Sequence, residues 1–275
     1  MKHLLLLLSG ILINSVSVFS QRNCDVFLTA GDSCSYKACD YLEKAPSFFQ
    51  LRKEFHDIYD KALEICPEYS DAYRGKSVAY LKTGDFINWK ILMDKAVELN
   101  PIEHLGYRAW CRFQFFRDYQ GAIEDIETLE SLSRTDIAYS QNGMYHLKVA
   151  KALCYKSLNK RKIAIQILED HLANYQGAPD LYDYLHLGVL YLEEENFGKA
   201  LATFEKQSQE YNCAENAYYK AMAYQGLTQT QKTQESLKLA HELYLNHKTM
   251  YDPYTHQVDK IFLADIEAEL EKSKN

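Results

Sequence analysis

The chain has 275 residues, of which 47% are hydrophobic, so it is long enough to bury a substantial core. Its formal net charge is −7, and no basic cluster stands out, which argues against nucleic acid or an anionic lipid surface as the main partner. Only 5 Pro and 11 Gly interrupt a composition rich in helix-favouring residues, and no Gly/Ser/Pro-rich linker divides the chain.

The first twenty residues predict a secretory signal peptide. Lys2 precedes an apolar run over 4–13, and small or aliphatic residues lead up to Ser20, as in exported proteins. We expect cleavage after Ser20 and a protein that is periplasmic, envelope-associated or extracellular. The alternative is an uncleaved anchor, although Gly10 and Asn14 interrupt the apolar run that a membrane-spanning helix needs.

Residues 21–35 form a Cys-containing segment ahead of the regular pattern. Export would permit disulfides, and Cys24, Cys34 and Cys39 are candidates for a bridge that ties down the N-terminus. The chain has 7 Cys, so at least one is free or pairs between chains. Their spacing is not that of a zinc site and no His lies nearby, so we expect neither a metal nor a cofactor.

The pattern over residues 36–246 predicts successive helix pairs. The first pair is incomplete, because Pro46 interrupts its first helix and only the second, around Tyr59, is clear. The second pair, Ser70–Pro101, has a turn at Gly84-Asp85, with Asp85 as the cap of the next helix. Its pattern consists of Tyr73, Ser77, Tyr80, Gly84, Asp85, Phe86, Met93, Ala96 and Pro101.

Further pairs follow, of which the third spans His104–Leu132 and the fifth Tyr182–Glu210. The fifth repeats the pattern with Tyr184, Leu187, Gly188, Tyr191, Phe197, Ala200 and Phe204. A polar insertion, Ser131–Gly143, separates the third pair from the fourth, and it is either a plain connector or part of a binding face. A last helix, Thr255–Lys272, is expected to cap the array within residues 247–275.

The repeated pattern resembles the tetratricopeptide repeat, W-x2-L-G-x2-Y…A-x3-F…P. This resemblance implies an all-α fold, an α-solenoid of antiparallel helix pairs with about five to six units. In this family the exposed positions of the first helices line a concave groove. By resemblance, the partner-binding residues are Arg74, Tyr107, Gln114, His146, Lys156, Tyr182, Tyr218 and Met222.

Two departures from the pattern place Trp89 and Trp110 where small residues are usual. Both rings either widen the core or, with Tyr139 of the insertion, form an aromatic ligand site.

The sequence contains no metalloprotease, nucleophile-elbow or phosphate-loop motif. We therefore expect an exported scaffold that binds a protein or peptide in its groove and has no catalysis of its own. The alternative is an envelope protein that binds a small ligand or glycan through its aromatic residues, and an enzyme is a third hypothesis. The sequence does not specify the partner or the oligomeric state.

Overall fold

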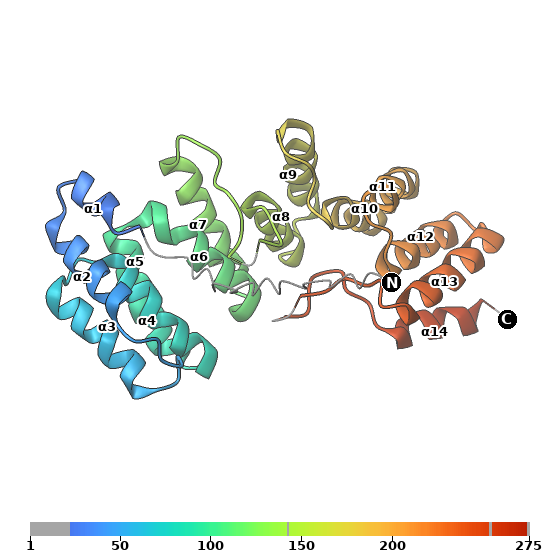
Figure 1. Ribbon diagram of the computed structural model, residues 1–275. Coiled ribbons are helices and arrows are strands. Elements are labelled where there is room, and N and C mark those ends of the chain that lie inside the picture. The colour runs from blue at the N-terminus through green and yellow to red at the C-terminus, as the bar shows by residue number, and fades with distance from the viewer. Residues whose placement is uncertain (1–22, 142, 253–254, 274–275) are drawn as a thin grey trace, which may run out of the picture. The chain divides into compact units, whose positions relative to one another are not determined.

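The computed structural model describes residues 23–141, 143–252 and 255–273 (Figure 1). The predicted signal peptide, residues 1–20, lies outside them. The chain divides into two compact units, unit 1 over residues 1–95 and unit 2 over residues 96–275. Among the helices of the described residues, none combines the length and apolar character that crossing a bilayer requires.

The described residues are organised almost entirely as helices, and no extended strand occurs among them. In unit 1 the helices are α1 (Asp25–Thr29), α2 (Ser33–Lys44), α3 (Lys53–Ile65), α4 (Ser70–Thr83) and α5 (Phe86–Leu99), the last of which runs on into unit 2. In unit 2 they are α6 (Pro101–Cys111), the π-helical turn η1 (Arg112–Phe116), α7 (Tyr119–Leu132), α8 (Leu147–Ser157), α9 (Arg161–Asn174), α10 (Asp183–Glu193), α11 (Phe197–Glu210), α12 (Ala214–Gly226), α13 (Thr230–Leu245) and α14 (Leu263–Lys272).

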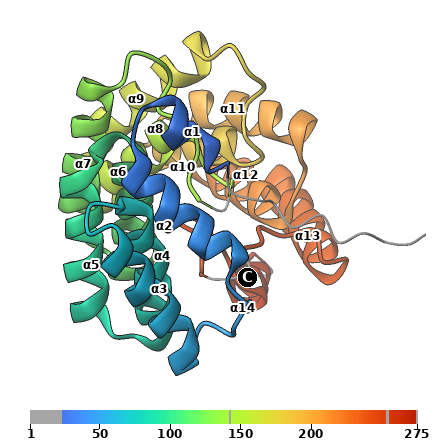
Figure 2. The ribbon, with the colours of Figure 1, turned by 60° about the vertical axis from the view of Figure 1, so that its left-hand side comes forward.

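Unit 2 is built from four consecutive helix pairs, α6 with α7, α8 with α9, α10 with α11, and α12 with α13. Both views show α12 and α13 lying side by side (Figures 1 and 2). The pairs close tightly because small residues face large ones. A Cβ on Gly188 would lie 2.4 Å from a ring carbon of Phe204, whose side chain is fully buried. The expected all-α solenoid of antiparallel helix pairs is confirmed.

Local signals explain where many helices begin and end. Gly84 ends α4 in the left-handed region, at φ 77°, and the expected cap Asp85 accepts a hydrogen bond from the Asn88 N–H at 3.1 Å. Asp118 and Asn196 cap α7 and α11 in the same way. The turn residues of the repeat therefore fix its helix boundaries.

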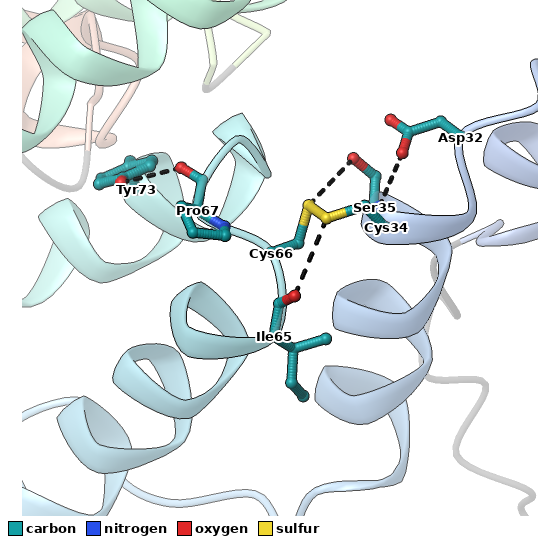
Figure 3. The surroundings of a disulfide bond; sticks show 7 residues. All are labelled: Asp32, Cys34, Ser35, Ile65, Cys66, Pro67 and Tyr73. Carbon is teal, nitrogen blue, oxygen red and sulfur yellow. Dashed lines mark hydrogen bonds between the residues drawn. A yellow bond between two sulfur atoms is a disulfide. The ribbon is translucent and has the colours of Figure 1, made fainter.

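Two cysteine bridges hold unit 1. Cys24 pairs with Cys39, and Cys34 pairs with Cys66 at the end of α3, a residue outside the three predicted candidates. Around the second bridge, the Ser35 hydroxyl lies 4.0 Å from the Cys66 sulfur (Figure 3). The bridges join α1 to α2 and α2 to the end of α3, so the first three helices of this unit are cross-linked. In unit 2, Cys111, Cys154 and Cys213 are buried thiols.

Two boundaries differ from the sequence expectations. Helix α2 begins at Ser33, inside the segment that we assigned to residues 21–35, because Asp32 caps it by accepting from the Ser35 N–H at 2.9 Å. The last helix begins at Leu263 rather than at residue 255. Its start is fixed by Asp265, whose side chain accepts from the Phe262 N–H at 2.8 Å.

Candidate functional site

The most unusual feature of unit 2 is the connection between α13 and α14. We call its described residues, 248–252 and 255–261, the crossing segment. Figure 1 shows them between the end of α13 and the start of α14, on the side of α12. Its described residues contact α8, α10 and α12. These are the first helices of successive pairs, the face that the repeat resemblance assigns to the groove. We call this surface the inner face of unit 2.

Several contacts hold the crossing segment through its own main chain. The Met250 N–H donates to the carboxyl of Glu215 on α12 at 2.9 Å. The Tyr251 N–H donates to the hydroxyl of Tyr182, at the start of α10, at 3.2 Å. The Tyr219 hydroxyl of α12 donates to the carbonyl of Asp259 at 3.2 Å. Side chains of the inner face therefore bind the main chain of a segment that has neither helix nor strand, as a peptide-binding surface does.

The crossing segment is anchored by one acidic side chain, Asp259. Its side chain is 6% exposed and lies against the Lys156 ammonium of α8 and, at 2.8 Å, against Nδ1 of His186 on α10. Burial alone would raise the pKa of Asp259, but the Lys156 charge and the His186 hydrogen bond outweigh it, so the pKa lies below its ordinary value. Asp259 is therefore a buried carboxylate held by two partners.

The positive side of this cluster extends outward from Lys156. Its Nζ lies 3.1 Å from Glu193, which also meets Arg161 at 2.8 Å. Without Asp259, this cluster would contain Lys156 and Arg161 against the single carboxylate of Glu193. The site therefore needs one more anion to balance its charge.

Glu215 shows that the segment also covers polar groups of α12. Its side chain has no exposed surface, and burial raises its pKa, while the Met250 N–H and the charge of Lys260 act in the opposite direction. Lys260 itself donates to the Met250 carbonyl, so the two ends of the crossing segment are bonded to each other.

The residues predicted to bind a partner lie in different surroundings. Lys156 and Tyr182 both contact the crossing segment, and Tyr182 is only 3% exposed. Tyr218 and Met222 are half-buried on α12. Gln114 and Tyr107 are buried on η1 and α6, and Arg74 is half-buried in unit 1.

His146, another of these residues, has a structural position. It is fully buried at the start of α8, where its Nδ1 accepts from the Lys148 N–H at 3.2 Å. Its Nε2 therefore carries the proton and donates to Asp136 at 2.8 Å. Its ring stacks on His171 of α9, with centroids 4.5 Å apart. These contacts make His146 a helix cap rather than an open groove residue.

Next to this stack lies Asp183, the first residue of α10, which is 1% exposed. Its Oδ2 accepts from the Asp180 N–H at 2.9 Å and lies 3.9 Å from Nε2 of His171. Burial raises the pKa of Asp183 to about 7 and, with the neighbouring His146, lowers that of His171 to about 4. Burial therefore disfavours the charged form of both groups.

The two Trp residues that depart from the repeat pattern lie in the core of the structure. Trp89 is 3% exposed and Trp110 is 5% exposed, so a ligand could reach neither ring without movement. Tyr139 is 38% exposed, and its hydroxyl lies 2.9 Å from that of Tyr175. With Tyr107, Tyr139 lines a pocket of about 210 Å³, which is smaller than typical ligand sites.

A larger pocket of about 430 Å³ lies where α7, α8 and α9 meet. His171 and Tyr175 line it together with charged residues of both signs: Glu130, Asp136, Lys148, Lys151 and Asp170. No group of three His, Cys, Asp or Glu side chains positioned to hold a metal ion occurs in the part of the chain that the structure describes.

Sequence reasoning missed the residues that carry the crossing segment, namely His186, Glu215, Tyr219 and Asp259. They are spread over 74 positions of sequence and form no local motif. The repeat pattern identifies α10 and α12 as the first helices of their pairs, and this indicates which face forms the groove. It does not indicate which segment lies on that face.

Comparison with known proteins defines the class of fold. No family model and no curated protein matches the sequence. Among solved structures, the chain is similar to PilW, described as a widely conserved type IV pilus biogenesis factor. The TM-score is 0.58 at 12% identity, covering 89% of this chain and 94% of that one.

PilF of Pseudomonas aeruginosa gives a TM-score of 0.56 at 14% identity, covering 90% of this chain and 100% of that one. BtubC of P. vanneervenii gives 0.51 at 15% identity, with 88% and 98% covered. At such identities the likeness shows the fold alone. The chain has the tetratricopeptide-repeat fold that its sequence pattern resembles.

Proposed function

We propose that this protein is an exported, non-catalytic scaffold that binds a protein or an extended peptide on the inner face of unit 2. The observation that carries the proposal is the crossing segment, a stretch without helix or strand whose main chain donates to the side chains of Tyr182 and Glu215 and accepts from that of Tyr219. A face that binds one such stretch has the donors and acceptors to bind another.

Export is supported by the cysteines of unit 1. Two bridges in one small helical unit are typical of proteins in an oxidising compartment. N-terminal sequencing of the mature protein should begin near Gln21, and an intact Met1 would exclude cleavage.

The absence of catalysis is part of the same proposal. The titratable groups that converge in unit 2 bond to one another, as His186 does with Asp259 and His146 with Asp136. Such mutual pairing positions helices, and it accounts for these groups without any reaction.

The proposal is tested by selecting peptides from a random displayed library with the full-length protein. Binding of the selected peptides should weaken at least about tenfold in Tyr218→Ala and in Met222→Glu, because both residues are half-buried on α12, the helix whose Glu215 and Tyr219 bind the crossing segment. Ile163→Glu, at a 46% exposed position of α9, is the matched control and should bind as the wild type does. Equal losses in all three variants, or failure to select any peptide, would exclude the proposal.

A second candidate function is binding of a small polar ligand or glycan in the pocket of about 430 Å³, whose size is in the normal range for ligand sites. Calorimetric titration with envelope sugars should then give a signal that Lys148→Met and Tyr175→Phe reduce. A flat titration of the wild-type protein would count against this function.

A further inference from the structure

We propose that the crossing segment is a built-in occupant of the peptide-binding face, and that the partner is an extended acidic peptide whose carboxylate replaces that of Asp259. This inference rests on the proposed function, and it adds the chemistry of the partner and a device that controls access to it.

The first argument is the way in which the segment is bound. The described residues on both sides of Pro253-Tyr254 have no regular secondary structure and lie against α8, α10 and α12. Met250, Gln257 and Ile261 are buried, whereas Tyr251 is 67% exposed. The segment therefore buries some of its side chains against the inner face and leaves others exposed, as a bound peptide does.

The second argument is charge. The cluster contains two positive charges, Lys156 and Arg161, and Glu193 neutralises only one of them. Asp259 supplies the second negative charge. Beneath the segment the Lys156 side chain is only 9% exposed, and without Asp259 its ammonium would keep Glu193 as its carboxylate partner. A ligand that covers Lys156 again without an acidic group would bury a charge that has lost one of its partners, which is unfavourable. A ligand that carries an acidic side chain of its own avoids this cost.

The third argument is that the occupant fits imperfectly. Nε2 of His186 is buried without a hydrogen-bond partner among the described residues, whereas the amide of Gln257 lies against the buried Tyr145 hydroxyl. An unpaired buried group costs free energy that a better-matched peptide, or water after release, would recover. The segment is thus bound less tightly than its buried area implies, which suits an occupant that is exchanged.

The fourth argument is tethering. The segment is fixed on both sides, by α13 and by α14, which pack on each other. Ile261 and Ile266 belong to one apolar cluster with Ala214, Ala217, Ala240 and Leu243. Residues 248–260 can leave the inner face without loss of α14, so opening does not require unfolding of the array.

The first experiment concerns the segment alone. Hydrogen exchange of the full-length protein should show faster exchange over residues 255–261 in Asp259→Asn, by at least about tenfold, with α8, α10 and α12 still protected. Tyr219→Phe removes only the hydroxyl that bonds the Asp259 carbonyl, and it gives the same result to a smaller degree should Asp259→Asn not fold. Asp57→Asn breaks an exposed ion pair with Lys53 of unit 1 and is the control. Unchanged exchange in both Asp259→Asn and Tyr219→Phe would overturn the proposal.

The second experiment supplies the occupant from outside. A fluorescent peptide with the sequence of residues 248–262 should bind the Asp259→Asn protein at least about tenfold more tightly than the wild type, whose site is filled. The same peptide carrying Asp259→Asn should bind at least about tenfold more weakly, because it lacks the carboxylate for Lys156. Equal binding to both proteins, or equal binding of both peptides, would overturn the proposal.

The two proposals fail in different ways. If the segment opens and the peptide binds, but library selection yields no peptide sensitive to Tyr218→Ala, self-occupancy stands and the scaffold function is excluded. If library peptides bind at the inner face while the segment keeps its protection, the scaffold function stands and the built-in occupant is excluded.

Discussion

Replacing Asp183 by Asn should make the protein less sensitive to rising pH. The wild-type carboxyl is 1% exposed, its Oδ1 has no hydrogen-bond partner, and burial raises its pKa from the ordinary 3.8 to about 7. A carboxyl whose pKa is raised on folding stabilises the fold below its unfolded pKa, and this contribution is lost as pH rises through the folded value. The asparagine resembles the protonated acid at every pH and has no such loss.

The magnitude follows from the two pKa values. Between pH 5 and pH 8 the Asp183 contribution falls by roughly 2–3 kcal/mol, since most of the interval lies between the unfolded and folded values. His171, whose pKa burial lowers to about 4, changes in the opposite direction, because its stabilising neutral form is lost as pH falls. His171 is present in both proteins but lies 3.9 Å from Asp183, so His171→Ala made in both backgrounds measures how much of the difference comes from coupling between the two groups.

Urea unfolding followed by circular dichroism at pH 5 and pH 8 measures this difference. The unfolding free energy of Asp183→Asn relative to wild type should rise by roughly 2–3 kcal/mol from the lower to the higher pH. Asp170→Asn, at an exposed position of α9, should show no such rise. A difference that is flat with pH, or that falls, would mean that Asp183 is ionised in the folded chain and paired with His171, 3.9 Å away.

Two other predictions concern packing and the cysteines. Gly188→Ala should destabilise unit 2 by about 1 kcal/mol or more in thermal unfolding, because its Cβ would lie 2.4 Å from buried Phe204 and the cost of overpacking exceeds the gain in helix propensity. Gly198→Ala is the control: the new Cβ has open space around it, so the protein should keep its stability or gain up to about 1 kcal/mol. Equal effects of the two substitutions would refute the packing argument. Cys34→Ala with Cys66→Ala should destabilise unit 1 by roughly 2–4 kcal/mol, with no change in the exchange protection of unit 2, and equal loss in both units would contradict their independence.

The repeats could be predicted because their determinants are local. Gly84, Asp85 and Asp118 act within a few residues of themselves, as turn and cap. The small and large residues of each pair, such as Gly188 and Phe204, meet across a hairpin that recurs along the chain. When a residue pattern recurs at a constant spacing, the contacts that its residues make recur as well. The fold class could therefore be predicted from the sequence.

The last helix shows where local reasoning fails. Val258, Ile261 and Phe262 have the spacing of a helical face, which led to the prediction of a helix over 255–272. The structure begins that helix at Leu263, where Asp265 caps it by accepting from the Phe262 N–H. Before the cap, Asp259 is held by Lys156, 103 residues earlier, and by His186, 73 residues earlier, and contacts at such separations leave no periodic trace in the sequence.

The groove residues show a related failure. The family pattern placed Lys156 and Tyr182 on the inner face, where they lie, but exposure depends on what covers a face. The covering segment comes from outside the repeats, so the repeat pattern contains no information about it. Burial of Trp89 and Trp110 was one of two expectations left open, and the structure places both in the core.

The covered inner face has a quantitative consequence for any partner that binds there. A partner that binds only the open form has its apparent affinity reduced by the fraction of molecules that are open. If the segment is held by about 3 kcal/mol, that fraction is below about 1% and the apparent dissociation constant rises more than 100-fold. The intrinsic interaction must then be strong, and the Lys156 ammonium, which the departure of Asp259 leaves with Glu193 alone, is the charge that an acidic partner would meet.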